Sequence, residues 1–223
     1  MTDRVSFKSS SDHTVEGALA TPAGDGKAPG VVLLQEYWGI NDHVRSLVTR
    51  MAAEGFVTLA PDLYHGKVAT TAAEAGAMMG ALDWPHTLDD IAAAVAYLRA
   101  HPRCNGKVAV TGFCLGGALS FATACAVPGL AAVVPFYGVP AQADWSKVDA
   151  PILAHFAQID EWAKPELARD IQQTLQGQGK SMELHVYDAQ HAFCNDTRPE
   201  VYAPEAAKLA WQRTVDFIRS HTA

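Results

Sequence analysis

The chain has 223 residues, of which 49% are hydrophobic and 18% are charged. These fractions are close to the averages of soluble globular proteins, and they exclude disordered and fibrous classes. The formal net charge of -7, without a dense run of lysine or arginine, argues against a nucleic-acid partner. There is no internal repeat, low-complexity segment or linker, so we expect a single domain over residues 1–223.

No segment predicts export or membrane insertion. The start of the chain has no apolar stretch of signal-peptide length. The longest apolar runs, such as Leu130 to Tyr137, are far shorter than the roughly 20 residues that span a bilayer. The four cysteines are therefore expected as reduced thiols in the cytoplasm. They form no CxxC pair, so we expect no structural metal site.

The expected elements begin with two short β-like runs, Arg4 to Lys8 and Thr14 to Thr21. Turn-forming residues from Ser9 to Asp12 join them, which predicts an antiparallel hairpin. Strands and helices then alternate, as is typical of a mostly parallel sheet with helices on both faces. The expected strands are Gly30–Glu36, Phe56–Ala60, Lys107–Thr111, Leu130–Tyr137, Pro151–Ala157 and Met182–Tyr187. The expected helices are Asn41–Glu54, Ala72–Leu82, Thr87–Ala100 (with Thr87 and Asp90 as a capping pair), Leu115–Ala126, Pro165–Gln176 and Pro204–His221.

The segment Gly112-Phe-Cys114-Leu-Gly-Gly117 lies between an expected strand and an expected helix. This is the layout of a nucleophile elbow with cysteine in place of serine, in which glycines permit a sharp and strained turn. A helix N-terminus favours the thiolate form of Cys114, and the Leu115 N–H points where an oxyanion would develop. The alternative is that Cys114 only packs in a tight turn, and the flanking strand and helix favour the nucleophile.

A base and an acid follow downstream in the chain order that such elbows use. His191 comes after the last expected strand and before the final helix, whereas the rivals His155 and His185 lie inside expected strands. Asp160 follows the strand Pro151–Ala157, with Glu161 as the second choice. We expect Asp160 to orient the His191 imidazole and to stabilise its charged form.

A further carboxylate, Glu36, lies at the C-terminal end of the strand Gly30–Glu36. Ligands bind at the C-terminal ends of strands in open α/β sheets, and the loop here normally supplies a second oxyanion donor, the Tyr37 N–H. Glu36 so placed can accept the thiol proton. A surface carboxylate or a structural hydrogen-bond acceptor explains Glu36 equally well from the residues alone.

Glu36, the Cys114 elbow, the Asp160 loop and the segment His191-Ala-Phe together resemble the dienelactone hydrolase family, from about Gly30 to the C-terminus. The resemblance implies an α/β-hydrolase fold and a carboxymethylenebutenolidase-like enzyme that needs no cofactor and acts as a monomer. It implies a Cys-His-Asp triad and a thioester acyl-enzyme, with Glu36 helping to generate the thiolate. The implied substrate is a small ester or lactone.

The sequence departs from this family where the substrate carboxylate is held. Family members that act on dienelactone are similar in carrying two arginines there, one of them four residues after the histidine. That position is Asn195 here, and no arginine lies between Met51 and Leu98, only Lys67, His65 and His86. Asparagine cannot form the bidentate clamp of arginine, so we expect neutral esters and lactones to be better substrates than dienelactone.

The sequence therefore predicts an ester or lactone hydrolase with no nucleic-acid or membrane partner. Expected substrate contacts are Trp38, Trp84 and Asn195. The candidates to line an apolar acyl pocket are Trp38, Tyr64, Trp84, Phe136 and Trp162, although aromatic residues in such a fold are more often core. An acyltransferase using the same site remains an alternative. A second alternative is a non-catalytic protein that binds a ligand or senses redox state, because Cys194 lies three residues past His191.

Overall fold

The computed structural model describes residues 2–223, in which eight strands form one sheet with the order β1-β2-β4-β3-β5-β6-β7-β8. The residues separate into two compact units, one up to Val110 and the other from Thr111 to Ala223, and β5 (Cys104–Phe113) crosses the boundary. The mostly parallel sheet, the N-terminal antiparallel pair and the six α-helices confirm the predicted fold class. Within residues 2–223, no helix combines the length and the apolar character that crossing a membrane requires.

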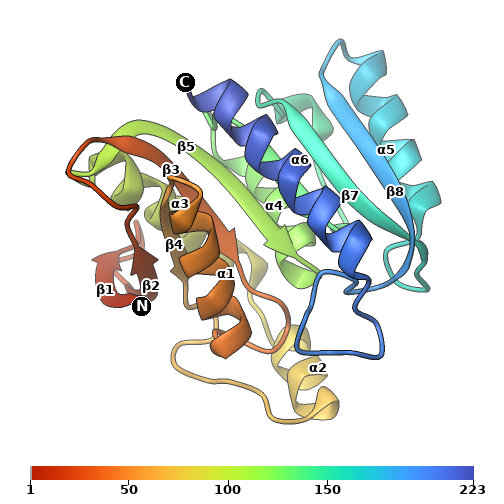
Figure 1. Ribbon diagram of the computed structural model, residues 1–223, viewed down its shortest axis with the longest axis horizontal. Helices are drawn as coiled ribbons and strands as arrows, with labels where there is room; N and C mark the ends of the chain where they lie inside the picture. Colours follow the sequence, from red (N-terminus) through yellow and green to blue (C-terminus); the bar gives the residue numbers. More distant parts are fainter. Residues whose placement is uncertain (1) are drawn as a thin grey trace. The chain divides into compact units, whose positions relative to one another are not determined.

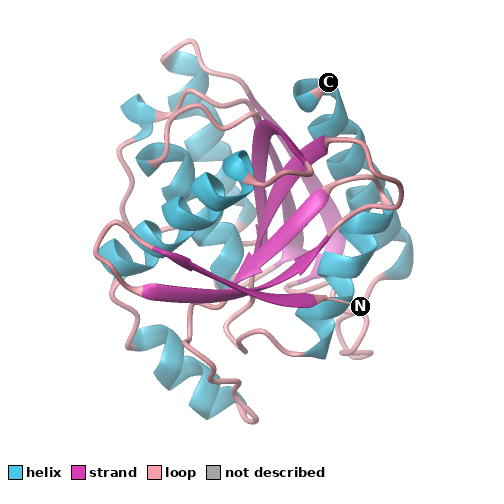
Figure 2. Ribbon diagram, turned by 90° about the vertical axis from the view of Figure 1, so that its left-hand side faces the viewer, coloured by secondary structure: helices cyan, strands magenta, loops and turns pink. Residues whose placement is uncertain are grey.

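The first unit contains the predicted hairpin. Strands β1 (Asp3–Lys8) and β2 (Thr14–Ala20) pair antiparallel, and β2 then pairs antiparallel with β4 (Val57–Pro61). Strand β3 (Ala28–Leu34) is parallel to β4 and buried along most of its length, as its nearly continuous apolar run predicts. Figure 2 views the molecule from the side of β1 and β2.

Three helices belong to this unit: α1 (Asp42–Ala53), α2 (Ala72–Gly80) and α3 (Trp84–Ala100). Helix α1 packs on β2 and β4, and α3 packs on β1, β3 and β4, with α1 in front of the strands and α3 behind them (Figure 1). Helix α1 has the predicted bounds within a residue, because Asn41 caps its start and Gly55, with φ of +99°, follows its end.

The predicted start of α3 is wrong by three residues. The helix begins at Trp84, and the Asp83 side chain caps it by accepting the His86 N–H at 3.0 Å. The Thr87 hydroxyl donates to the Asp83 carbonyl instead of capping, so the predicted pair of Thr87 and Asp90 does not form. Pro85 explains the earlier start, because proline is suited to the first turn of a helix.

The second unit continues from β5 through α4 (Leu115–Ala126), β6 (Val133–Phe136), β7 (Ile152–Ile159), α5 (Pro165–Gly177), β8 (Met182–Gln190) and α6 (Pro204–Thr222). A short 3₁₀ turn, Trp145–Lys147, precedes β7. Strands β6, β7 and β8 are parallel. Helix α6 packs on β7 and β8 and lies toward the viewer in Figure 1, whereas α4 packs on β6 and lies behind.

Three predicted strands differ from the observed ones by three or more residues in length. Strand β5 begins three residues earlier and ends two residues later than the predicted Lys107–Thr111. Strand β6 is shorter, since Leu130 to Ala132 precede it. Strand β8 runs three residues further than predicted, to Gln190. It is an edge strand, so the polar side chains of Asp188 and Gln190 can lie on its exposed face. As a result His191 follows the strand with no intervening loop.

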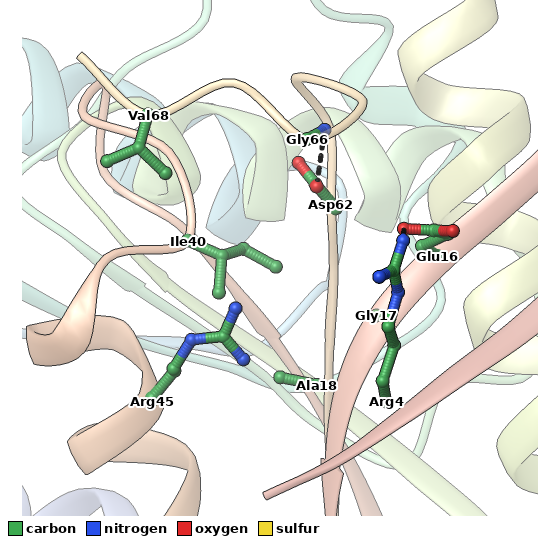
Figure 3. A pocket seen from close by; sticks show the side chains of 9 residues that line it. All are labelled: Arg4, Glu16, Gly17, Ala18, Ile40, Arg45, Asp62, Gly66 and Val68. Carbon is green, nitrogen blue, oxygen red and sulfur yellow. Dashed lines mark hydrogen bonds and ion pairs between the residues drawn. The ribbon is translucent and has the colours of Figure 1, made fainter.

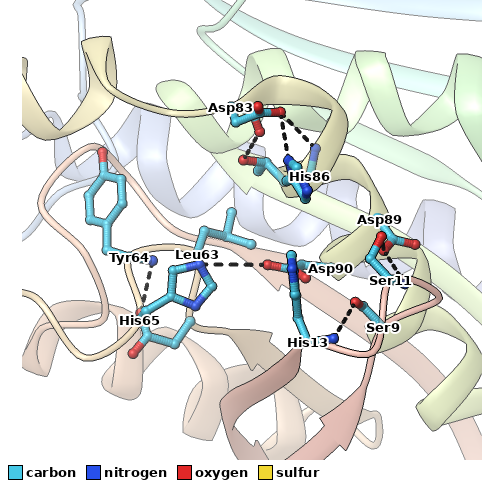
Figure 4. Close-up of polar contacts among 12 residues, drawn as sticks. Ser9, Ser11, His13, Leu63, Tyr64, His65, Asp83, His86, Asp89 and Asp90 are labelled. Carbon is cyan, nitrogen blue, oxygen red and sulfur yellow. Dashed lines mark hydrogen bonds and ion pairs between the residues drawn. The ribbon is translucent and has the colours of Figure 1, made fainter.

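A polar cluster joins the β1–β2 turn to α3 in the first unit (Figure 4). Asp89 accepts hydrogen bonds from the hydroxyls and backbone N–H groups of Ser10 and Ser11. These bonds, led by the one from the Ser10 hydroxyl, hold the pKa of Asp89 below its usual range. Its neighbour Asp90 is buried, which raises the pKa of Asp90, and His65 lies 3.9 Å from it.

We expect the change Asp89→Ala to lower the free energy of unfolding by about 1 kcal/mol at pH 7, because two serine N–H groups and two hydroxyls lose their acceptor at a partly exposed site. The carboxylate has a lowered pKa in the folded state, so its contribution is lost as the pH falls. Urea unfolding should therefore show a stability gap between wild type and variant that is constant from pH 7 to about pH 5 and narrows below about pH 4, the pKa of the unfolded state. The exposed Asp25→Ala is the control, and an equal loss in that variant would contradict the assignment.

Candidate active site

Cys114 occupies a strained position at the start of α4. Its backbone has φ of +57° and ψ of -113°, a region that side-chain-bearing residues rarely adopt. Its N–H donates to the Phe136 carbonyl at 3.1 Å, and its own carbonyl accepts from the N–H groups of Gly117 and Ala118. The half-buried Cys114 side chain therefore stands at the tip of a sharp strand-to-helix turn.

Two glycines make this turn possible because backbones meet there. A Cβ added to Gly117 would lie 2.1 Å from the Phe136 oxygen, and one added to Gly138 would lie 2.0 Å from the Cys114 oxygen. Neither distance is compatible with any side chain. Gly117 belongs to the elbow pattern of the sequence, but the second glycine, Gly138, lies on another segment, after β6.

His191 and Asp160 come from the ends of neighbouring parallel strands. Asp160 follows β7 and His191 follows β8, so the two residues leave the sheet at the same edge. The pairing of β7 with β8 contains a bulge: two steps from Ala157 to Ile159 match three steps from Tyr187 to Gln190. The His191 N–H then donates to the Ile159 carbonyl at 3.2 Å.

The Asp160 carboxylate is fully enclosed and accepts three hydrogen bonds. Its Oδ2 accepts from His191 Nδ1 at 2.6 Å, and its Oδ1 accepts from the N–H groups of Trp162 and Ala163, each at 2.9 Å. Burial raises the pKa of Asp160, but the hydrogen bond from His191 and the charge of the imidazole outweigh it, so the pKa is lowered. Asp160 therefore stays ionised beside the imidazole. Glu161, the second choice, is exposed and lies 4.0 Å from Lys164.

The second ring nitrogen of His191, Nε2, is buried and has no hydrogen-bond partner among residues 2–223. The Cys114 side chain also interacts with the His191 imidazole. Burial lowers the pKa of His191, but its hydrogen bond to Asp160 and its interactions with Cys114 reverse this effect and raise the pKa to about 10. The imidazole is thus favoured in its charged form between a carboxylate and a sulfur atom.

Aromatic rings surround the imidazole on two sides. The Tyr137 ring lies 5.1 Å from it edge-on, and Tyr137 has an unusual φ of +33° at the end of β6. The Trp162 ring lies 6.0 Å away and is 67% exposed. Sequence reasoning missed Tyr137; the only signal was the pair Tyr137-Gly138 at the end of a strand.

The rival histidines have other partners. His155 is completely buried, and its ring nitrogens lie 2.8 Å from the Tyr187 hydroxyl and 3.1 Å from the Thr214 hydroxyl. Burial holds the pKa of His155 well below its usual range, so it is a neutral core residue. His185 bonds to Glu183 at 2.6 Å on the edge strand.

The other predicted site residues lie away from these groups in the chain. Glu36, Tyr37 and Trp38 follow β3, and Trp84 begins α3, all in the first unit. Glu36 is buried, whereas Tyr37, Trp38 and Trp84 are half-buried. Asn195 is 2% exposed, and its side-chain oxygen accepts hydrogen bonds from the Thr197 N–H and hydroxyl.

A hollow of about 280 Å³ lies in the first unit (Figure 3). Its charged lining residues are Arg4, Glu16, Arg45 and Asp62. Arg4 is paired with Glu16, and the Asp62 carboxylate accepts a hydrogen bond from the Gly66 N–H. It contains neither a cysteine nor a histidine, so it offers no nucleophile and base together. Among residues 2–223, no group of three or more potential ligand side chains is arranged to hold a metal ion.

We expect the change Gly138→Ala to lower the free energy of unfolding by at least about 3 kcal/mol, because the added methyl group collides with the Cys114 carbonyl. The matched control is Gly177→Ala at the end of α5, where a Cβ meets nothing within 4 Å. That change should leave stability equal or raise it slightly. Urea unfolding of both variants checks this, and similar midpoints would show that the close approach is not needed.

Comparison with known proteins places this arrangement in a family. The model of the dienelactone hydrolase family matches residues 15–222. The chain is 36% identical over 219 residues to protein usf of Aquifex pyrophilus, covering 93% of this chain and 94% of that one. It is 32% identical over 231 residues to a carboxymethylenebutenolidase of Pseudomonas putida, covering 98% and 96%.

Solved structures agree with the sequence relatives. A crystal structure of a candidate dienelactone hydrolase from Klebsiella pneumoniae subsp. pneumoniae superposes with a TM-score of 0.89 at 26% identity, covering 98% of both chains. The predicted resemblance is therefore confirmed over nearly the whole sequence. The chain belongs to the dienelactone hydrolase family and is a hydrolase of the ester or lactone class.

Proposed function

We propose that the protein hydrolyses small neutral esters or lactones through a Cys114-His191-Asp160 triad and a thioester acyl-enzyme. The observation that supports this most directly is the placement of His191. Its Nδ1 is bound to the buried Asp160 carboxylate at 2.6 Å, and its buried Nε2 is left to interact with the side chain at the tip of the elbow. Such a ring can exchange a proton at one nitrogen only.

In the first half of the reaction, the Cys114 thiol passes its proton to His191 Nε2 and the resulting thiolate attacks the carbonyl carbon. A C–S bond forms and the carbonyl electrons move to oxygen. The Leu115 N–H belongs to the first turn of α4, where N–H groups have no partner within the helix, and it donates to that oxyanion. When the tetrahedral species collapses, the C–O bond breaks and His191 gives its Nε2 proton to the leaving alkoxide.

In the second half, His191 takes a proton from water as the water oxygen attacks the thioester. The C–S bond then breaks, the carboxylic acid leaves and the sulfur atom returns to its starting state. Asp160 does not exchange a proton; it fixes the tautomer and orientation of the imidazole and offsets its positive charge. The expected contributions of Glu36 and of the Tyr37 N–H come from the first unit and stay predictions.

The preference for a neutral substrate follows from Asn195. The resemblance to the family implies an arginine at this position in members that hold a substrate carboxylate. Asn195 is almost completely buried, and its oxygen is engaged by Thr197 within the loop that follows His191. A neutral side chain that is committed to its own loop offers no charge to an anionic substrate.

We expect the change Cys114→Ala to lower kcat/KM for p-nitrophenyl acetate by about a thousandfold or more, because the nucleophile is lost. The control is Cys125→Ala on α4: burial raises the pKa of Cys125 to about 11, so this thiol stays protonated at neutral pH. Steady-state kinetics and intact-mass detection of an acetylated protein check both variants. Retained turnover or acetylation in Cys114→Ala would refute the assignment.

The raised pKa of His191 predicts the pH at which kcat/KM falls on the alkaline side. Proton donation to an alkoxide needs the imidazolium, so kcat/KM for butyl acetate should fall as the pH rises through about 10. In Asp160→Asn the stabilising negative charge is gone, so the pKa of His191 drops and the alkaline limb should move down by at least about one pH unit.

The exposed neighbour Glu161→Gln is the control for this titration and should leave the limb in place. A pH-stat assay between pH 6 and 11 measures the three profiles. An identical alkaline limb in wild type and Asp160→Asn would show that the carboxylate does not act on the imidazole.

A further inference from the structure

Exposed apolar side chains gather beside the catalytic carboxylate. Within residues 2–223, five large hydrophobic side chains are exposed, and three of them lie within nine residues of chain: Ile159, Trp162 and Leu167, which are 59%, 67% and 42% exposed. Single exposed apolar residues are ordinary, but a cluster of them next to a reactive site indicates a binding surface. Asp160 lies inside this cluster.

A groove of about 420 Å³ lies in the same unit, between the segment that follows β6 and one face of α5. Its apolar lining comes from Val139, Pro140 and Ala141 on one side and from Leu167 and Ile171 on the other. Leu167 thus belongs both to the exposed cluster and to the groove. The groove therefore continues the apolar surface away from Trp162.

Both lining segments of the groove follow residues of the candidate site in the chain. One begins at Val139, directly after Gly138, which packs against the Cys114 carbonyl. The other begins at Leu167, five residues after Trp162, whose ring lies beside the His191 ring. Both segments therefore connect the groove to the candidate site along the chain.

We propose, resting on the proposed function, that this apolar surface and groove bind the alcohol portion of the substrate, and that this portion is an extended uncharged hydrocarbon. The direction follows from the chemistry. His191 delivers its proton to the leaving alkoxide, so the alcohol lies on the imidazole side of the scissile bond. The Trp162 ring lies on that side, 6.0 Å from the imidazole.

Charge selects against an acidic alcohol portion. Among the groove-lining residues of the described chain, Asp170 is the only charged side chain, and it lies on the same face of α5 as Leu167 and Ile171. A carboxylate in the groove would meet a like charge and no lysine or arginine. A plain alkyl chain avoids this repulsion and removes apolar area from water.

The experiment measures kcat/KM for acetate esters of ethanol, butanol and hexanol, together with p-nitrophenyl esters of acetate, butyrate and hexanoate. We expect kcat/KM to rise about twofold per methylene along the alcohol series. This corresponds to half of the free energy of burying a methylene, because the groove is open on one side. No comparable gain is expected along the acyl series. The acetate ester of 6-hydroxyhexanoate should react about tenfold or more slowly than hexyl acetate.

Variants test the surface through the ratio of hexyl to ethyl acetate turnover. Trp162→Ala and Leu167→Ser should each reduce this ratio at least about threefold, mainly through KM. The matched control is Leu209→Ser, another exposed apolar residue, which lies on α6 and should leave the ratio unchanged. Light scattering on the same samples reports whether the surface instead joins two copies of the chain.

The outcomes separate the two proposals. Turnover of ethyl acetate that depends on Cys114, without a gain along the alcohol series, overturns the groove assignment and leaves the hydrolase intact. A gain along the acyl series alone, an unchanged ratio in both variants, or a dimer that Trp162→Ala converts to a monomer also overturns it. If no ester is hydrolysed in a Cys114-dependent way, the proposed function itself fails.

Discussion

The structure of the candidate site depends on a contact between two stretches of backbone. The Cys114 carbonyl lies against Gly138, and the Phe136 carbonyl lies against Gly117, at distances that leave no room for a Cβ atom. The same segments are tied by the hydrogen bond from the Cys114 N–H to the Phe136 carbonyl. This close contact holds Cys114 at a positive φ, where an isolated cysteine would not remain, and the packed core offsets the cost of that conformation.

A second constraint is electrostatic. Removing an ionised carboxylate from water is costly unless hydrogen bonds replace the lost solvation. Asp160 meets this condition with two backbone N–H groups and the His191 imidazole. The two N–H groups come from the loop that carries Trp162, so the residues that hold the carboxylate also fix where the exposed indole lies. The geometry of the candidate site and the apolar surface therefore both depend on one short loop.

Much of the fold and of the candidate site was predictable from the sequence, because the sequence patterns that indicate them are local. The bounds of α4 matched, since the glycine-rich elbow marks its start and small apolar residues fill it. The chain order of Cys114, Asp160 and His191 identified three residues that the second unit brings together. The start of α3 was missed because the capping pattern at Thr87 was weighed above Pro85. Tyr137 was not found, because its contact with His191 depends on strand neighbours and no spacing in the sequence records it.

Because of the bulge at the end of β8, the orientation of the His191 imidazole depends on the number of residues in that strand. Three residues of β8 are matched to two of β7 immediately before His191, and this offset sets the direction in which the ring leaves the sheet. A strand turns each successive side chain to the opposite face, so removing or adding one residue between Tyr187 and Gln190 would point the ring away from Asp160. Exposed side chains of this strand, such as Asp188 and Gln190, can thus be exchanged without turning the ring, whereas an insertion or deletion before His191 cannot be made without that effect.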